Sequence, residues 1–182
     1  MDWRAIIQRC LNGDNEAWEM LVRKYSKRIF NLAYQFSGIY EEAEDMTQEI
    51  FLKLFKSLRQ YNFKANFEAW FIKLAKNHCI DHYRKSKCEK SKRINFNDLE
   101  RLISNNSNPE NDLLRKEKLK IVFNGLKNLS PEIRMVIILR DIQGMSYEEI
   151  AQIMELPLGT IKSRINRGRI QLAENLKNGL KQ

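Results

Sequence analysis

A short basic segment near the C-terminus carries side chains that could bind DNA. Its hydrogen-bond donors are Lys162, Ser163, Arg164, Asn166, Arg167 and Arg169. At helical spacing, Ser163, Asn166 and Arg167 fall opposite an apolar side that contains Ile161 and Ile165. One buried face and one donor-rich face are what a helix in a DNA major groove requires. The alternative is an ordinary basic face exposed to solvent.

The segment before it favours DNA contact. Ser146 and Glu149 match the S-x-x-E capping box, so a helix is expected to begin at about Ser146. Pro157 and Gly159 then interrupt the apolar pattern before the basic helix. Two short helices with a tight break between them indicate a helix-turn-helix unit.

An acidic stretch in the first third of the chain has a different chemistry. Residues 41–49 contain five acids and no base, and Glu42, Asp45 and Glu49 share a helical face with Gln48 close by. By composition alone, two interpretations are equally good. The stretch is either a solvated face that the helix dipole favours, or a docking surface for a basic protein.

Residues 59–85 interleave aromatic and cationic side chains, a pattern that suits single-stranded nucleic acid. Phe67, Trp70 and Phe71 are expected in the core, because large aromatic side chains dominate burial. Tyr61 and Asn77 are the better candidates for exposed positions. The other polar side chains of the helix expected from about Asn66 are Lys73, Lys76, Arg84 and Lys85.

His78, Cys79, His82 and Cys88 contain potential zinc ligands, but their spacing matches no common zinc module. We therefore expect no metal site and no cofactor. The sequence also shows no phosphate-binding glycine loop and no nucleophile or paired carboxylates placed for catalysis. An enzyme that processes nucleic acid is disfavoured for this reason.

The composition favours a polyanionic partner. Among 182 residues, 32 Lys and Arg against 23 Asp and Glu leave a net charge of +9. An anionic membrane surface would also suit this charge, but no apolar run approaches the roughly 20 residues that span a bilayer. Three cysteines, an odd number, fit a reducing compartment. We expect a soluble, cytoplasmic protein that does not insert into membranes.

The hydrophobic pattern predicts an all-α protein with two small helical domains and a flexible polar linker. The N-terminal domain is expected over residues 1–85, with a break at Asn12–Asp14 and another at Gly38. Residues 86–111 form the linker, with a short helix possible over 98–103. The C-terminal domain, residues 112–182, is expected to begin with a helix capped by Asp112, and Ser130-Pro131-Glu132 opens the next one.

Three blocks in this order resemble the bacterial sigma-70 family, in its small two-domain extracytoplasmic-function (ECF) group. They are residues 42–55, EAEDMTQEIFLKLF; residues 65–85, ANFEAWFIKLAKNHCIDHYRK; and residues 129–169, which contain the helix-turn-helix pattern. The resemblance implies an initiation factor that joins core RNA polymerase, directs it to promoters and helps to open the DNA. It implies no enzymatic activity of the chain itself.

The resemblance also implies roles for individual residues. Glu42, Asp45, Gln48 and Glu49 would bind the clamp helices of the largest polymerase subunit, while the C-terminal domain would meet the flap. Tyr61, Asn77, Arg84 and Lys85 would serve the −10 element, with Tyr61 and Asn77 capturing a flipped base. Lys162, Ser163, Asn166 and Arg167 would read the −35 element, and Arg164 and Arg169 would hold phosphates.

Two features of the sequence bear on promoter preference. The loop NFKAN, residues 62–66, lacks the Gly/Asp-rich form common in the family, and Asn166 occupies a position where the family varies. Many family members are held by an anti-sigma factor, which is therefore a possible partner here. The alternative function is a free-standing helix-turn-helix regulator, but such proteins usually dimerise on paired half-sites. That reading leaves the acidic stretch and the aromatic loop unexplained.

Overall fold

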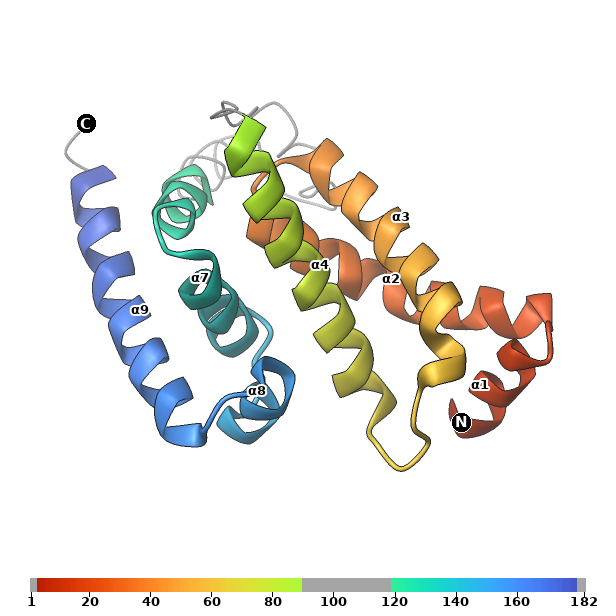
Figure 1. Cartoon of the computed structure of the whole chain (residues 1–182). Coiled ribbons are helices and arrows are strands. Elements are labelled where there is room, and N and C mark those ends of the chain that lie inside the picture. Colours follow the sequence, from red (N-terminus) through yellow and green to blue (C-terminus); the bar gives the residue numbers. More distant parts are fainter. Residues whose placement is uncertain (1–2, 90–118, 180–182) are drawn as a thin grey trace, which may run out of the picture.

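A computed structural model describes residues 3–89 and 119–179, and within those ranges every regular element is helical (Figure 1). This confirms the all-α prediction. The N-terminal group of helices consists of α1 (Trp3–Leu11), α2 (Asn15–Ser37), α3 (Tyr40–Ser57), the 3-10 turn η1 (Leu58–Gln60) and α4 (Phe67–Glu89). The C-terminal group consists of a helix over 119–127, α7 (Pro131–Ile137), the π-helical η3 (Ile138–Ile142), α8 (Tyr147–Met154) and α9 (Leu158–Gly179).

The helix ends follow from local side-chain chemistry, as predicted. The Asp14 carboxylate accepts a hydrogen bond from the Ala17 N–H at 3.1 Å and caps α2. Gly38 ends α2 in the left-handed conformation with φ 74°, which glycine adopts without strain. The capping box at Ser146 and Glu149 is fully formed at the start of α8.

Two boundaries differ from the expected ones. Helix α4 continues to Glu89, so the first four residues of the expected linker belong to this helix. Pro157, whose missing N–H suits the first turn of a helix, lies instead just before α9, and its carbonyl accepts hydrogen bonds from the Thr160 and Ile161 N–H groups. The expected cap at Asp112 and the possible helix over 98–103 lie outside the described residues.

Helices α2, α3 and α4 pack side by side around an aromatic centre. The Tyr25 ring meets the Phe67 and Phe71 rings edge-on, with centroid separations of 5.8 and 5.5 Å. Phe67 and Phe71 are buried, which confirms their predicted core positions, and Trp70 packs partly buried against them. The arrangement fixes α3 and α4 as neighbours, each with one face left for other contacts.

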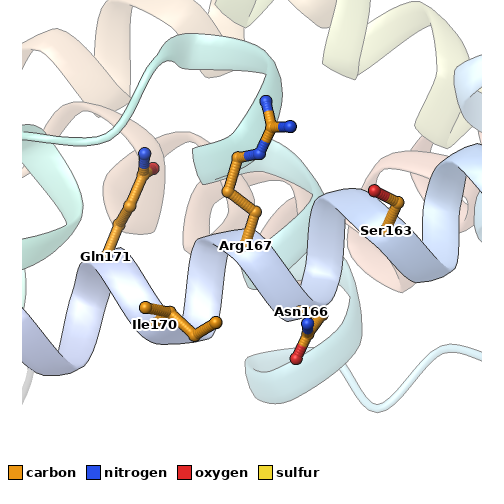
Figure 2. Close-up of a pocket in the computed structure, with 5 residues that line it drawn as sticks. All are labelled: Ser163, Asn166, Arg167, Ile170 and Gln171. Carbon is orange, nitrogen blue, oxygen red and sulfur yellow. The ribbon is translucent and has the colours of Figure 1, made fainter.

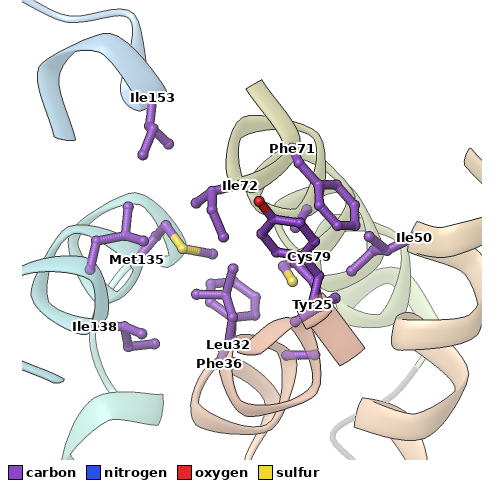
Figure 3. Close-up of a cluster of buried hydrophobic side chains, with 14 of the residues drawn as sticks. Tyr25, Leu32, Phe36, Ile50, Phe71, Ile72, Cys79, Met135, Ile138 and Ile153 are labelled. Carbon is purple, nitrogen blue, oxygen red and sulfur yellow. The ribbon is translucent and has the colours of Figure 1, made fainter. Parts of the chain in front are cut away.

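The apolar core continues from the N-terminal group into the C-terminal group (Figure 3). Ile72 of α4, Met135 of α7 and Ile153 of α8 are at most 2% exposed and point into one cluster with Leu32 and Phe36 of α2. Apolar surface removed from water stabilises such contacts by roughly 25 cal/mol per Å². The two groups of helices are therefore joined by a packed interface within the described chain.

Arg134 is a buried cation at this interface, with 1% of its surface exposed. Its guanidinium donates hydrogen bonds to the carbonyl oxygens of Phe36, Lys127 and Leu129, at 2.9, 2.7 and 3.2 Å. It also lies over the rings of Phe36 and Tyr83, 5.1 and 4.9 Å from their centroids. Burial lowers the pKa of Arg134; the three carbonyls and two rings contact its guanidinium, whereas its buried Nε has no hydrogen-bond partner.

Two glycines of α9 give a matched test of the packing. A Cβ at Gly168 would lie 2.7–2.9 Å from side-chain atoms of Ile133 and Ile137, whereas nothing lies within 4 Å of one at Gly159. Gly168→Ala is expected to lower the free energy of unfolding by about 1–3 kcal/mol through overpacking. Gly159→Ala is expected to raise it by about 0.5–1 kcal/mol through backbone entropy. Urea unfolding of both variants measures the difference, and equal effects would contradict the close contact between α7 and α9.

Candidate nucleic-acid interface

The donor-rich face of α9 is open to solvent, as the sequence predicts. An open hollow on this helix is lined by Ser163, Asn166, Arg167, Ile170 and Gln171 (Figure 2). In this view, the Arg167 and Gln171 side chains extend in the same direction from the helix. The surface therefore offers hydroxyl, amide and guanidinium donors next to an apolar side chain, the mixture that reads base edges in a major groove.

The opposite face of α9 holds the helix in place. Ile161 and Ile165 are 0% and 2% exposed, and they lie in the core with the helices before them. Glu155 joins α8 to α9 in the left-handed conformation with φ 57°, so the chain turns within three residues. A buried face and a tight turn together keep the exposed donors in a fixed orientation.

Two arginines expected to hold phosphates are less free than the others. Arg164 is half-buried, and Arg169 makes two hydrogen bonds to the Asp141 carboxylate, at 3.1 and 2.5 Å. These bonds raise the pKa of Arg169 still further, so its charge is permanent. Asp141 of η3 therefore binds the Arg169 guanidinium in this conformation, while half of the Arg169 side chain stays exposed.

The acidic face of α3 is exposed over most of the expected stretch. Asp45, Gln48 and Glu49 lie on the surface, but Glu42 is half-buried. Glu42 is close enough to Lys127 for its charge to oppose the lowering of the Lys127 pKa that burial causes. Of the four residues named from the sequence, Asp45, Gln48 and Glu49 therefore form the exposed acidic stripe.

Sequence reasoning missed two apolar members of this surface. Leu52 and Phe55 are 59% and 62% exposed, unusual values for large apolar side chains on a packed helix. The helical spacing groups Phe55 with the apolar side chains of α3, but in the structure its ring lies tilted against Trp18, with 5.0 Å between the centroids, and stays mostly exposed. The signal was present in the spacing: Leu52 follows Asp45 by seven residues and Phe55 follows Gln48 by seven, two helical turns in each case.

His78 of α4 connects this surface to the core. Its Nδ1 lies 2.8 Å from the Lys53 ammonium, and its Nε2 lies 3.4 Å from a Glu49 carboxylate oxygen. Burial and the Lys53 charge lower the pKa of His78, so the ring is neutral and accepts a hydrogen bond from Lys53. The Lys53–His78 hydrogen bond joins α3 to α4, whereas the buried Nε2 has no hydrogen-bond partner and Glu49 stays exposed.

The loop before α4 departs from the expectation for Tyr61. The Tyr61 side chain is only 6% exposed, and its hydroxyl donates a hydrogen bond to the Ala65 carbonyl at 2.5 Å. Its ring packs against Phe63 and Trp70 at centroid distances of 5.2 Å. The prediction that Tyr61 is exposed is therefore wrong, because the aromatic core extends into the loop and includes its ring. The loop instead exposes Asn62 and residues 64–66.

Asn77, Arg84 and Lys85 are exposed on α4, as expected. Arg84 is paired with Glu132 at the start of α7, with 3.0 Å between Nη2 and the carboxylate oxygen. Lys73, one turn before Asn77, is paired with Glu155 at 2.6 Å. Hence two cations of α4 face acids of the C-terminal group.

The His78–Cys79–His82 segment shows no convergent ligand set. Cys79 is completely buried in the core, and burial raises the pKa of its thiol to about 12. The rings of His78 and His82 are 6.3 Å apart, centroid to centroid. Within residues 3–89 and 119–179, no cluster of three His, Cys, Asp or Glu side chains could hold a metal ion. The side chain of Cys88 lies outside the described residues.

None of the described helices has both the length and the apolar character needed to cross a bilayer.

Comparison with protein families finds two matches. Residues 21–88 match sigma-70 region 2, and residues 122–172 match sigma-70 region 4. The ECF RNA polymerase sigma-E factor of Escherichia coli is 33% identical over 174 residues, covering 91% of this chain and 90% of that protein. The ECF RNA polymerase sigma factor SigE of Mycolicibacterium smegmatis is 36% identical over 168 residues; the match covers 90% of this chain and 64% of that protein.

Solved structures show the same architecture. The structure of CnrH in complex with the cytosolic domain of CnrY matches with a TM-score of 0.70 and 25% identity, covering 97% of this chain and 99% of the other. The sigma factor RpoE in complex with the anti-sigma factor NepR, from Bartonella quintana, matches with a TM-score of 0.67 and 26% identity, covering 87% and 96%. Both comparisons extend over the N-terminal and C-terminal groups of helices.

Proposed function

The chain belongs to the ECF group of the sigma-70 family of RNA polymerase sigma factors, and from this premise we propose that it binds core RNA polymerase and directs it to particular promoters. The observation that carries the proposal is the separation of two surfaces on one chain. Asp45, Gln48, Glu49, Leu52 and Phe55 form an exposed acidic and apolar surface on α3, whereas α9 exposes donors suited to DNA. The polymerase would carry out the chemistry, and the chain would act with it in the cytoplasm.

The α3 surface suits a basic protein partner with an apolar centre. Leu52 and Phe55 would be buried on docking, while Asp45 and Gln48 would meet cationic and polar groups around them. We assign this surface to the clamp helices of the largest polymerase subunit and the C-terminal group to the flap. An exposed surface of this kind favours a docking factor over a free-standing helix-turn-helix regulator, which has no use for it.

The direct test is transcription by purified core polymerase on a fragmented genomic library, with and without the chain, followed by mapping of start sites. The proposal predicts start sites that depend on the chain and share upstream elements near −10 and −35. Random starts at the background level of core polymerase would overturn it. Free-standing regulation would instead appear as DNA binding that core polymerase does not alter.

Arg167 is proposed to read a base in the −35 element. Arg167→Ala is expected to reduce the discrimination between the correct and a mutated −35 element by about 1–3 kcal/mol, because a bidentate guanidinium contact is lost. Competition binding of the polymerase complex to promoter variants measures this difference. Arg164→Ala is the matched control, since a phosphate contact weakens binding to all sequences alike. Uniform weakening by Arg167→Ala would reassign it to phosphate.

For the −10 element we propose that Asn77 contacts a flipped base and that Lys85 holds nearby phosphate. Asn77→Ala is expected to slow promoter opening more than duplex binding, because base capture offsets the cost of local melting, a few kcal/mol. Transcription from a template already melted at −10 should restore the variant. Lack of rescue would exclude base capture by Asn77. Tyr61, being buried, is assigned to shaping the loop at residues 62–66.

A further partner is proposed from the solved relatives. The structures of CnrH and of RpoE from Bartonella quintana were determined in complexes, the latter with an anti-sigma factor. We propose that a protein of this class regulates the present chain as well.

A further inference from the structure

Lys53 of α3 is an exposed cation among the residues that we assign to polymerase binding. It follows Glu49 by four residues, the spacing at which a glutamate and a later lysine pair on one helix. Such a pair would neutralise an acid that a basic partner requires. In the described part of the chain, however, Lys53 makes no ion pair with Glu49, and its ammonium lies 2.8 Å from Nδ1 of His78 on α4.

The hydrogen-bond roles at His78 follow from the chemistry of lysine. An ammonium can only donate, so Nδ1 of His78 accepts, and the hydrogen of the neutral ring lies on Nε2. That Nε2 is buried without a hydrogen-bond partner, and it lies 3.4 Å from a Glu49 carboxylate oxygen. The imidazole therefore accepts from one surface residue and presents its donor nitrogen close to the other.

The apolar core holds the His78 ring in this position. Helices α3 and α4 lie side by side (Figure 1), and only 5% of His78 is exposed between them. Its neighbours Cys79 on α4 and Leu54 on α3 are fully buried. A buried ring has little freedom to move, so it offers Lys53 a fixed acceptor. The exposed Glu49 carboxylate would first have to be ordered to form an ion pair.

We propose that His78 is a positioning residue for polymerase binding: it binds the Lys53 ammonium, prevents its pairing with Glu49, and so keeps the Glu49 carboxylate available for cations of the clamp helices. The inference rests on the proposed role of α3 in binding polymerase. In the docked chain, the carboxylate pairs outward with the polymerase and accepts a hydrogen bond from the His78 Nε2–H, since its oxygens accept several bonds at once. Helix α4 thus contributes to docking through a buried side chain.

Replacing His78 tests this role. In His78→Leu, the Lys53 ammonium loses its acceptor and is expected to pair with Glu49. Affinity for immobilised core polymerase should fall roughly 2- to 5-fold at low ionic strength, the strength of a surface ion pair, and less at high salt. Adding Lys53→Ala to His78→Leu should restore the affinity. His78→Gln should retain it, because an amide has both an acceptor and a donor.

Two substitutions are matched controls. Lys56→Ala removes a charge about one turn further along α3, and His82→Leu removes the other histidine of the chain. His82→Leu should leave the affinity unchanged, and Lys56→Ala should restore His78→Leu less than Lys53→Ala does. Equal affinity of His78→Leu and the unaltered chain overturns the proposal. A loss that Lys53→Ala restores no better than Lys56→Ala also overturns it, since such a loss would come from the fold.

Nitrogen-15 NMR of the imidazole tests the geometry in the free chain, without polymerase. The proposal expects the His78 hydrogen on Nε2 and none on Nδ1, and this preference should weaken in Lys53→Ala. A ring with its hydrogen on Nδ1 overturns the proposal, whatever the polymerase result. Absence of retention of the unaltered chain on core polymerase would instead overturn the proposed function, and with it the role of His78 in docking.

Discussion

Reversing the charge of the α3 surface is expected to weaken binding to core RNA polymerase on the order of 100-fold or more, because like charges across an interface cost several kcal/mol. The variant is Asp45→Lys with Glu49→Gln. Glutamine is chosen for Glu49 because a lysine there would add an ammonium beside Lys53 and His78. Retention of the chain on immobilised core polymerase measures the effect.

The matched control is Glu19→Lys with Glu16→Gln, which changes the net charge equally on the exposed first turns of α2. This control should bind polymerase as the unaltered chain does. Circular dichroism and urea unfolding establish that both variants fold. Leu52→Ala supplies an independent check, since loss of an exposed apolar side chain affects binding without leaving a cavity. Equal retention of the charge variant and its control would remove α3 from the interface.

Removing the buried guanidinium of Arg134 is expected to cost about 3–5 kcal/mol of folding free energy, among the largest effects of any single substitution in the chain. Arg134→Met fills similar volume but leaves the Phe36, Lys127 and Leu129 carbonyls without this donor. Hydrogen bonds from a charged donor are stronger than neutral ones, and buried acceptors without partners are costly. Chemical denaturation measures the loss.

Arg140→Met is the control for Arg134. Arg140 donates to one carbonyl, that of Met145 at 2.7 Å, and lies 4.6 Å from the centroid of the Tyr147 ring. Because it is half-buried and bonds a single carbonyl, its loss should cost about 1 kcal/mol. Arg134→Lys tests geometry separately, since an ammonium cannot direct a planar fork at three carbonyls. A loss no larger than that of Arg140→Met would show that water replaces the guanidinium.

Asp45 and Arg134 act at different places in the molecule, one on the surface and one in the core. Asp45 is exposed, so its substitution should alter binding and leave the fold intact. Arg134 joins α7 to the end of α2, so its substitution should weaken the packing of the two groups of helices.

The helices and the surfaces they expose were predictable from the sequence because their causes are local. Helical spacing placed Ile161 and Ile165 inward and Arg167 outward, and the Ser146–Glu149 capping box located the start of α8. The acidic character of α3 was likewise visible within nine residues. The helical spacing in α9, the capping box of α8 and the acids of α3 are all patterns of residues close together in the sequence.

Tertiary packing decided which residues of distant segments those surfaces contact. Lys73 and Glu155 are 82 residues apart in sequence, and no spacing rule relates them. Burial of Tyr61, the pairing of Arg169 with Asp141 and the covering of Lys76 likewise depend on which helices become neighbours. The sequence alone determined the helices, their caps and the charge of each face. Which faces meet was decided by the burial of apolar surface between distant segments, because that free energy depends on their joint packing and not on any one of them.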